Sequence, residues 1–280
     1  MIRIPILNYH CLSDDPAPWI ADYTVTPGDF ARHLDLIVAG GRTVVPVSRL
    51  AEAATGRRPL PRDPVVITFD DGFADFADIA APALAARGLP STFYAATGSL
   101  EGRHRRETVF PPHPMVSWSR LPELEEQGVE IGAHSHTHRD LDLADPRVAA
   151  YEVVRSKELL EDALGHEITS FAYPYGHFTT RLLRVVAECG YDSACAVRSR
   201  LSRVGDNVFA LARLPLRAAT TVDEVGAWVS GRGARTASAR PDTLGIRADR
   251  LLRRVLRMPV LPEDGLADPA AVPARQREPS

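Results

Sequence analysis

Short apolar runs alternate with longer amphipathic stretches along most of this chain. Brief apolar runs indicate buried strands, and apolar residues spaced three and four positions apart indicate helices with one buried face. Strands are predicted at Ile2–Tyr9, Val44–Val45, Val65–Ile67, Ser91–Ala95, Gly128–Ala133, from Ile168 onward and at Leu211–Leu216. Helices are predicted at Pro27–Ala39, Ser48–Ala54, Phe73–Arg87, Ser119–Gln127, Arg147–Leu164 and Thr179–Glu188.

Several of these helices carry signals for where they begin and end. Thr26 can cap the first helix, Pro27 suits its first position, and Gly40-Gly41 stops it. Gly88 is expected to end the third helix. Repeated strand–helix units imply parallel strands, so the pattern predicts the α/β class and leaves a barrel and an open doubly wound sheet as alternatives.

Two adjacent carboxylates, Asp70 and Asp71, follow the apolar run Val65–Ile67. Neighbouring side chains of an extended strand point to opposite faces, so both can serve one site only if the backbone turns there. Gly72 makes such a turn possible. One carboxylate can then bind a divalent cation while the other takes a proton from the attacking water, although Asp-Asp-Gly alone is also an ordinary polar turn.

Three histidines lie further along, in His134-Ser135-His136-Thr137-His138. His134 and His138 are four positions apart, which puts both imidazoles on one side if the segment starts a helical turn. Two histidines and one carboxylate leave a coordination position open for water, as a catalytic zinc requires. We expect His136 to be the outlier, either solvated or behind the ligands.

A third segment, Phe171-Ala172-Tyr173-Pro174-Tyr175-Gly176, follows the apolar stretch from Ile168. Thr68-Phe69-Asp70-Asp71-Gly72, the histidine segment and the loop Pro174-Tyr175-Gly176, in this order, resemble the polysaccharide deacetylase family. This family is also called the NodB homology domain or carbohydrate esterase family four. The resemblance implies a distorted (β/α) barrel with fewer than eight regular strands.

The likeness runs from Ile4 to about Trp228, and Pro5-Ile6-Leu7-Asn8-Tyr9-His10 is similar to the first strand of one branch of the family. It implies that three residues hold the metal ion and that a fourth is the general base. The implied ligands are Asp71, His134 and His138, and the implied base is Asp70. Zinc is expected from the ligand types, and cobalt or nickel would accept the same set.

The Pro-Tyr-Gly loop is expected to form the floor of the substrate site. By the resemblance, the backbone N–H of Tyr175 would help to bind the oxyanion of the reaction intermediate. Pro174, Gly176 and the following His177 are expected to contact the substrate as well. Without the other motifs, the same residues would simply indicate a rigid turn.

Two positions depart from the family pattern, and both affect how protons would be transferred in the reaction. Many members carry an arginine that pairs with the base where this chain has Ala172; we expect Arg213 to replace it, unless Arg213 is a solvated strand residue. Members often place a general-acid histidine where this chain has Arg217. The acid is then His10, His177 or water, and His10 lies at the end of the predicted first strand.

The composition is that of an ordinary globular enzyme. A chain of 280 residues can form one barrel-sized domain, and a net charge of -3 argues against a nucleic-acid partner. Cys11, Cys189 and Cys195 make an odd count without CxxC spacing, which indicates reduced thiols. No signal-peptide pattern and no segment of transmembrane length are found, so we expect a cytoplasmic protein.

Residues 99–116 interrupt the alternation of strands and helices. This insertion carries the basic run Arg103-His104-Arg105-Arg106 and the proline-rich run Pro111-Pro112-His113-Pro114. We expect either a substrate-facing lid whose arginines meet an anionic group or a plain surface loop.

The composition changes again towards the C-terminus. We expect the catalytic barrel to span residues 1–235, and residues 236–280 to form a linker, a basic amphipathic helix at Ile246–Met258 and a disordered tail. The helix either packs on the barrel with a solvated basic face or makes a peripheral contact with a membrane or partner.

These observations predict a metal-dependent hydrolase that removes an N-acetyl group. The expected substrate is an N-acetylhexosamine unit in a glycan, a glycoconjugate or a small-molecule intermediate. One alternative is a hydrolase of another C–N bond, in a cyclic amide or ureide. The other is a non-catalytic carbohydrate-binding relative, which the departures at positions 172 and 217 suggest and the intact carboxylate and histidine set opposes.

Overall fold

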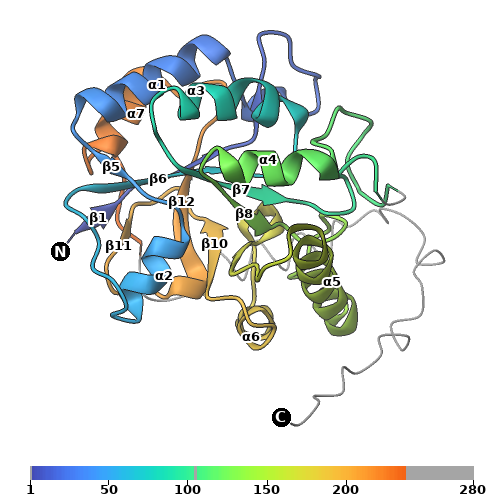
Figure 1. Cartoon of the computed structure of the whole chain (residues 1–280). Coiled ribbons are helices and arrows are strands. Elements are labelled where there is room, and N and C mark those ends of the chain that lie inside the picture. The colour runs from blue at the N-terminus through green and yellow to red at the C-terminus, as the bar shows by residue number, and fades with distance from the viewer. Residues whose placement is uncertain (1, 104–105, 238–280) are drawn as a thin grey trace.

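Among residues 2–103 and 106–237, which the computed structural model describes, seven parallel strands close into a barrel with helices around it (Figure 1). The strands are β1 (Arg3–Ile4), β2 (Ile6–Tyr9), β3 (Cys11–Leu12), β4 (Thr24–Val25), β5 (Thr43–Val44), β6 (Pro64–Phe69), β7 (Ser91–Ala95), β8 (Val129–Ala133), β9 (Ser170–Ala172), β10 (Ser193–Val197), β11 (Ser202–Arg203) and β12 (Leu211–Pro215). The helices are α1 (Pro27–Ala39), α2 (Ser48–Ala54), α3 (Ala81–Ala85), α4 (Leu121–Glu126), α5 (Pro146–Leu164), α6 (Thr180–Glu188) and α7 (Val222–Val229).

The order of strands around the barrel is β2, β12, β10, β9, β8, β7 and β6, and β6 pairs back onto β2. The closing register joins Asn8 to Thr68 and Tyr9 to Phe69. Strand β5 adds to the edge of β6 outside the closed ring. The predicted α/β class is confirmed, and the closing pair excludes the open doubly wound sheet. The fold is the distorted barrel that the family resemblance implies.

Most predicted helices form where the pattern placed them. Helix α1 has Thr26 as its N-cap, whose side chain accepts a hydrogen bond from the backbone N–H of Asp29. The helix predicted from Phe73 to Arg87 forms, but it begins one residue later, at Ala74, and ends at Ala85. Phe73 instead bridges to Met115, and a π-helical turn at Phe76–Ala80 leads into α3. Phe73 fits the helical pattern of the sequence, but it is buried beside Met115 and therefore stays outside the helix.

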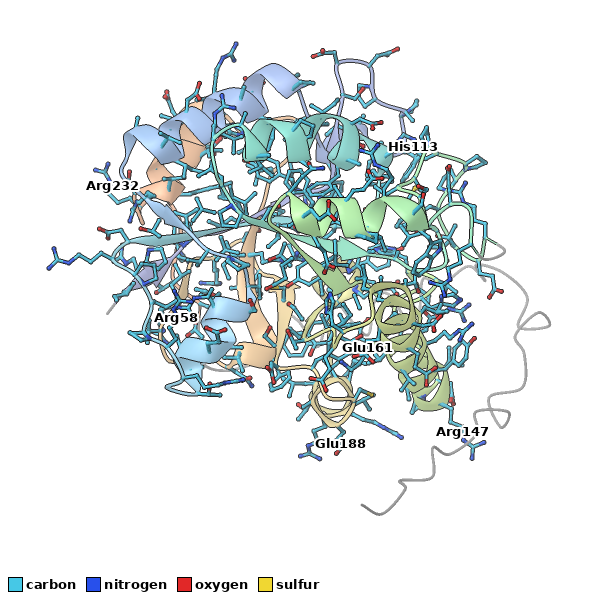
Figure 2. All side chains as sticks on the ribbon, viewed as in Figure 1. Arg58, His113, Arg147, Glu161, Glu188 and Arg232 are labelled. Carbon is cyan, nitrogen blue, oxygen red and sulfur yellow. The ribbon has the colours of Figure 1, made fainter. Side chains whose placement is uncertain are left out.

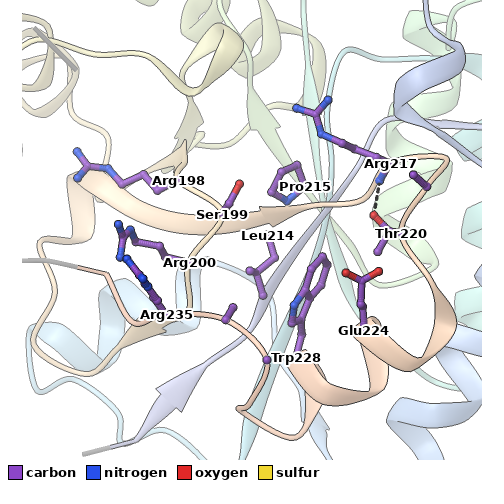
Figure 3. Close-up of a pocket in the computed structure, with 13 residues that line it drawn as sticks. Arg198, Ser199, Arg200, Leu214, Pro215, Arg217, Thr220, Glu224, Trp228 and Arg235 are labelled. Atoms are coloured by element: carbon purple, nitrogen blue, oxygen red, sulfur yellow. Dashed lines mark hydrogen bonds between the residues drawn. The ribbon is translucent and has the colours of Figure 1, made fainter. Parts of the chain in front are cut away.

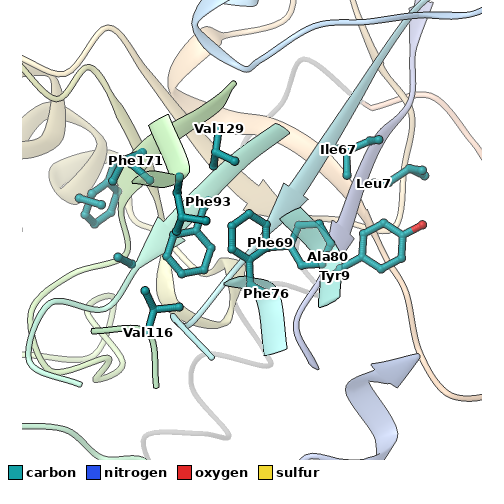
Figure 4. Packing of buried hydrophobic residues seen from close by; sticks show 14 of the residues in the cluster. Leu7, Tyr9, Ile67, Phe69, Phe76, Ala80, Phe93, Val116, Val129 and Phe171 are labelled. Atoms are coloured by element: carbon teal, nitrogen blue, oxygen red, sulfur yellow. The ribbon is translucent and has the colours of Figure 1, made fainter. Parts of the chain in front are cut away.

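The helices α1, α3 and α7 cover one side of the barrel through aromatic and aliphatic side chains (Figure 1). Figure 4 shows Phe69, Phe76 and Phe93 side by side at the surface of the sheet. The ring centroids of Phe76 and Phe93 are 4.3 Å apart, and those of Phe69 and Phe76 are 4.8 Å apart. Aromatic pairs at such distances add about 0.5–1.5 kcal/mol each beyond their burial. This layer fixes β6 and β7.

Alternate residues of the strands fill the inside of the barrel. The hydroxyl of Tyr94 in β7 lies 2.6 Å from Ser170 Oγ and donates to Cys195 Sγ, which links three strands across the interior. Gly132 in β8 packs against the Tyr94 ring, where an added Cβ would lie 2.5 Å from a ring carbon. The interior is therefore tightly packed, and fully buried Arg213 is part of it.

Long charged side chains such as Arg58, Arg147 and Glu188 point away from the ribbon (Figure 2). In the parts of the chain that the structure describes, no helix combines the length and the apolar character needed to cross a membrane. The predicted helix at 246–258 and the tail lie outside the described residues. Of the predicted linker, Thr236 bridges to Leu201 and Ala237 donates to Leu201 O, so this part lies on the barrel. The division at residue 235 stays a prediction.

Candidate metal centre and active site

Asp70 and Asp71 lie just beyond the end of β6. The backbone N–H of Asp70 donates to Tyr9 O over 3.0 Å, which continues the pairing with β2. The chain then turns, because Asp71 has a φ of 77° and Gly72 a φ of 100°. A positive φ at a non-glycine residue is strained and is found mainly where the surrounding structure enforces it. The turn brings both carboxylates to the same pocket.

The histidine segment after β8 is a loop, so the prediction of a helical turn is wrong. Ser135 has a φ of 63° and His138 a φ of 61°, and these two bends replace the helical spacing. The imidazoles of His134 and His138 still converge, with ring centroids 4.8 Å apart. The third histidine, His136, is buried behind the loop, where its Nδ1 lies 2.9 Å from Thr97 Oγ1.

A buried glutamate that the sequence analysis did not single out holds this loop. The Oε2 atom of Glu152, in α5, accepts hydrogen bonds from the backbone N–H groups of His136 and Thr137 at 2.9 and 2.7 Å. Its Oε1 atom accepts from Thr137 Oγ1 at 2.6 Å. Charge-assisted hydrogen bonds are stronger than neutral ones. Glu152 therefore fixes the stretch between the two converging histidines.

Three donor atoms face one another in the pocket. Asp71 Oδ1 lies 3.3 Å from His134 Nε2 and 3.2 Å from His138 Nε2. All three side chains are buried, and no hydrogen bond of the described residues satisfies Asp71 Oδ1. His134 Nδ1 lies 2.8 Å from Ala172 O, so this nitrogen carries the proton, and the lone pair of neutral Nε2 faces Asp71. Such a set needs a positive charge at its centre, and it fits a divalent metal ion.

The charges around this centre are mutually dependent. Burial alone would raise the pKa of Asp71, but His138 and His134 hold it well below its ordinary value. Burial alone would lower the pKa of His134, but Asp70 and Asp71 raise it. The carboxylates therefore stay ionised and attract a cation into a region from which water is largely excluded.

Asp70 has a different partner from Asp71. Arg213 of β12 donates from Nη1 to Asp70 Oδ1 and from Nη2 to Asp70 Oδ2, both at 2.6 Å. The same guanidinium donates to Thr68 Oγ1 and to Ala196 O. Burial alone would raise the pKa of Asp70, but Arg213 and then His134 hold it below its ordinary value. Arg213 is thus a buried ion partner and not a solvated strand residue.

The site opens into a cavity of about 510 Å³, which we call the active-site pocket. Its polar lining includes His10, Asp70, Asp71, His134, His138, His177 and Arg217, and its apolar and aromatic lining includes Trp19, Ile20, Tyr23, Val109, Phe110, Pro111, Tyr175, Val197 and Pro215. Gly176 also lines the pocket, whereas Pro174 does not. Of the ten predicted site residues, eight line this pocket at the C-terminal ends of the strands, and a ninth, Arg213, is the ion partner of Asp70.

The Pro-Tyr-Gly loop after β9 is bent sharply. Tyr175 has a φ of 57° and is half exposed, with its ring centroid 4.8 Å from that of His138. At Gly176 an added Cβ would lie 2.3 Å from Val197 N, so only glycine allows β10 to approach this closely. Pro174 is buried beneath the loop and supports it. The resulting shape presents Tyr175 to the pocket.

Both histidines proposed as proton donors reach the pocket. His10 follows β2, and its ring centroid is 5.0 Å from that of Tyr23. Burial lowers the pKa of His10, outweighing the nearby Asp71 and Asp70, so its imidazole is neutral at neutral pH. His177 lies on the opposite loop, with Nδ1 3.7 Å from Asp140 Oδ1.

The insertion at residues 99–116 contributes apolar groups to the pocket. Phe110 stands over the metal centre, with its ring centroid 4.4 Å from that of His138. Trp19 stacks on Phe110 at 6.1 Å. Of the described arginines in the insertion, Arg103 pairs with Asp162 and Arg106 donates to Pro111 O, and neither lines the pocket. The insertion therefore lies at the site through its apolar residues, and these two arginines lie outside the lining of the pocket.

The chain is similar to known proteins over most of its length. The family profile described as "Polysaccharide deacetylase" matches residues 57–194. The curated Bacillus subtilis (strain 168) protein named "Putative polysaccharide deacetylase YxkH" is 22% identical over 228 residues, which cover 81% of this chain and 76% of that protein.

Solved structures share the fold. The Streptococcus pyogenes deacetylase PplD, in complex with acetate, is 22% identical with a TM-score of 0.70, covering 80% of this chain and 96% of that one. A de-N-acetylase from Aggregatibacter actinomycetemcomitans is 21% identical with a TM-score of 0.67, covering 78% and 97%. The chain belongs to the polysaccharide deacetylase family.

Proposed function

We propose that this protein is a metal-dependent N-deacetylase that releases acetate from an N-acetylhexosamine unit of a glycan, glycoconjugate or small-molecule intermediate. The observation that carries the proposal is the convergence of Asp71, His134 and His138 beside the ion-paired Asp70 in one pocket. Family membership supports hydrolytic deacetylation. The metal requirement and the sugar are our inference.

In the proposed reaction, Asp71, His134 and His138 hold a divalent cation, which would supply Lewis acidity to the acetyl group. We take zinc as the default and cobalt or nickel as alternatives. Asp70 accepts a proton from the attacking water, because its partner Arg213 keeps it ionised and in place.

The rest of the pocket orients the acetyl group and protects the reaction from bulk water. The backbone N–H of Tyr175 is the proposed donor to the oxyanion, and the bend at this residue presents it to the pocket. The rings of Trp19 and Phe110 cover the metal centre. The C–N bond then breaks, and a proton passes to the departing amine.

The source of that last proton is either His10 or His177, with water as the third alternative. His10 is neutral at neutral pH, so it can donate only after it has taken up a proton during the reaction. His10→Asn and His177→Asn, compared by kcat on one substrate, separate the two: the donor's variant loses about 10²–10⁴-fold in kcat.

We also propose that the protein works in the cytoplasm. The support is chemical: Cys11, Cys189 and Cys195 are all unpaired in the structure, as expected for a reducing compartment. Partners other than an N-acetylated substrate are not needed for the proposed reaction.

The test is acetate release from a panel of N-acetylhexosamine monomers, oligomers, glycosides and nucleotide sugars. The protein is stripped of metal with a chelator and then supplied with zinc, cobalt or nickel. Activity should be absent without metal and return with it. Asp70→Asn should lower kcat by about 10³-fold. Asp78→Asn, an exposed aspartate on the helical segment that follows the same loop, is the matched control and should keep full activity.

Two other results would decide against the proposal. If no panel member releases acetate although metal is bound, a cyclic amide or ureide hydrolase becomes the better assignment where such compounds turn over. If none of them turns over, a non-catalytic carbohydrate-binding role replaces the enzyme. Full activity in Asp70→Asn would remove the general base from the mechanism.

A further inference from the structure

A second cavity, of about 610 Å³, adjoins the active-site pocket, and we call it the arginine cavity (Figure 3). It is lined by Arg198, Ser199, Arg200, Leu214, Pro215, Arg217, Ala219, Thr220, Glu224, Trp228, Gly233, Ala234 and Arg235. The lining comes from the segments after β10 and β12, from α7 and from the chain that follows α7. Four of these residues are arginines, which make the lining of the cavity rich in positive charge.

The two cavities are continuous in the lining. Pro215 and Arg217 line both of them, and Val197 of the active-site pocket is followed directly by Arg198 of the arginine cavity. Arg217 lies between them: its Nη2 donates to Tyr23 OH at 3.0 Å, and its guanidinium lies over the Tyr23 ring. A substrate with its acetyl group in the first pocket can therefore extend into the second.

Three of the arginines that line the cavity have no acidic partner among the described residues. In Figure 3, Arg198, Arg200 and Arg235 gather on one side, and Arg217 lies across the cavity. Among the described residues, the structure pairs none of Arg200, Arg217 and Arg235 with a carboxylate.

The cavity's single acidic lining residue is occupied elsewhere. Glu224 Oε2 accepts hydrogen bonds from the N–H and Oγ1 of Thr221 in the capping box of α7. Guanidinium groups gathered without carboxylates repel one another and create a positive potential that attracts an anion. The planar fork of arginine matches the oxygens of phosphate and carboxylate groups in particular.

We propose that Arg200, Arg217 and Arg235 bind a phosphate or diphosphate group carried by the N-acetylated substrate. This inference rests on the proposed deacetylase function. Phosphate is favoured over a carboxylate because a phosphate monoester carries about 1.5 to 2 negative charges at neutral pH, which balances more of the charge of these three arginines than a single carboxylate does. The same chemistry fits a sugar phosphate, a nucleotide sugar or a sugar linked to a lipid diphosphate.

The experiment compares kcat/KM for an N-acetylhexosamine glycoside and three phosphorylated counterparts of the same sugar. These are its 1-phosphate, its nucleoside diphosphate conjugate and a short-chain polyprenyl diphosphate conjugate. In the unmodified protein, at least one phosphorylated substrate should exceed the neutral glycoside by about tenfold or more. The member with the highest kcat/KM identifies the source of the phosphate.

Substitutions then locate the effect. Arg200→Gln with Arg235→Gln should lower the ratio of phosphorylated to neutral kcat/KM by about tenfold, and Arg235→Gln alone should lower it by a smaller factor. Arg232→Gln is the matched control, because this arginine is exposed and nearby but does not line the cavity (Figure 2). It should leave the ratio unchanged.

Calorimetric binding of inorganic phosphate gives a second readout that does not depend on turnover. Phosphate should bind the unmodified protein and Arg232→Gln, and should bind the double variant at least tenfold more weakly. Acetate release from the glycoside without any preference for phosphate would overturn this inference and leave the deacetylase proposal standing. Phosphate binding by the arginines without any acetate release would overturn the deacetylase proposal and leave the anion-binding site standing. An equal loss in Arg232→Gln would reduce the effect to general surface charge.

Discussion

The metal centre and the arginine cavity lie at the same end of the barrel, yet they are built in opposite ways. In the first, Asp70, Asp71 and His134 are almost fully buried, and Asp70 faces the opposite charge of Arg213. In the second, Arg217 and Arg235 are exposed, and the charges have the same sign. The side chains of the first region are held in place before any substrate binds, whereas the arginines of the second gain an opposite charge only when an anion binds.

This difference separates two tasks. Bond cleavage needs a base and ligands held within a fraction of an ångström, and burial with strong hydrogen bonds provides that precision. Recognition of an anion needs charge and reach, which mobile surface arginines supply at little cost in folding. The metal centre should therefore be sensitive to changes in buried contacts, and the arginine cavity to the number of charges and to salt.

The largest effect is expected from the buried ion pair. Arg213→Gln leaves Asp70 buried without its cation, which should destabilise the protein by about 3–5 kcal/mol at neutral pH. In the folded protein the pKa of Asp70 is depressed, so its stabilising contribution exists above the ordinary aspartate pKa and is lost as the pH falls through the folded value. The deficit of the variant in urea unfolding should therefore be full at neutral pH and smaller in acid.

The same substitution should change the pH dependence of the reaction. Without Arg213, burial raises the pKa of Asp70, so the acidic limb of the profile of kcat/KM against pH should move to higher pH. Arg203→Gln is the matched control. Arg203 lies in β11, pairs with Asp206 and lines neither cavity. An unchanged acidic limb in a folded Arg213→Gln protein would contradict the role of Asp70 as base.

The next effect is expected from the support of the histidine loop. Glu152→Gln places an amide where the backbone N–H groups of His136 and Thr137 need a full carboxylate. Loss of such support to ligands typically weakens metal binding by about 10–100-fold. Titration of the metal-free protein with zinc measures this loss of affinity. Glu158→Gln, exposed on the same helix α5, should bind zinc normally. Equal affinity in both variants would show that the loop holds its shape without Glu152.

The sequence predicted the metal centre because its parts are local. Asp70 and Asp71 follow one strand, His134 and His138 follow another, and the carboxyl ends of parallel strands meet at one end of a barrel. The barrel itself is confirmed, and so are helices with clear caps, such as α1. The roles of these residues stay proposals.

Other features could not be predicted because their signals are not local. The histidine loop is not helical: it bends at Ser135 and His138, and the backbone N–H groups between these bends donate to Glu152, which lies far along the chain in α5. The arginine cavity draws on residues from Arg198 to Arg235, which no single pattern joins. Helix α7 did carry a local signal, the capping box of Thr221 and Glu224, which a search for that motif would have found.

The smallest expected effect distinguishes the two regions without any substitution. Raising the ionic strength from about 0.1 M to about 1 M shortens the screening length from about 10 Å to about 3 Å, which weakens exposed charges far more than buried ones. The kcat/KM for a phosphorylated substrate should fall several-fold, because Arg217 and Arg235 are exposed. The kcat/KM for the neutral glycoside should change little, because Asp70 and Arg213 are buried. An equal fall for both substrates would place the salt-sensitive step in the metal centre and remove the contrast between the two regions.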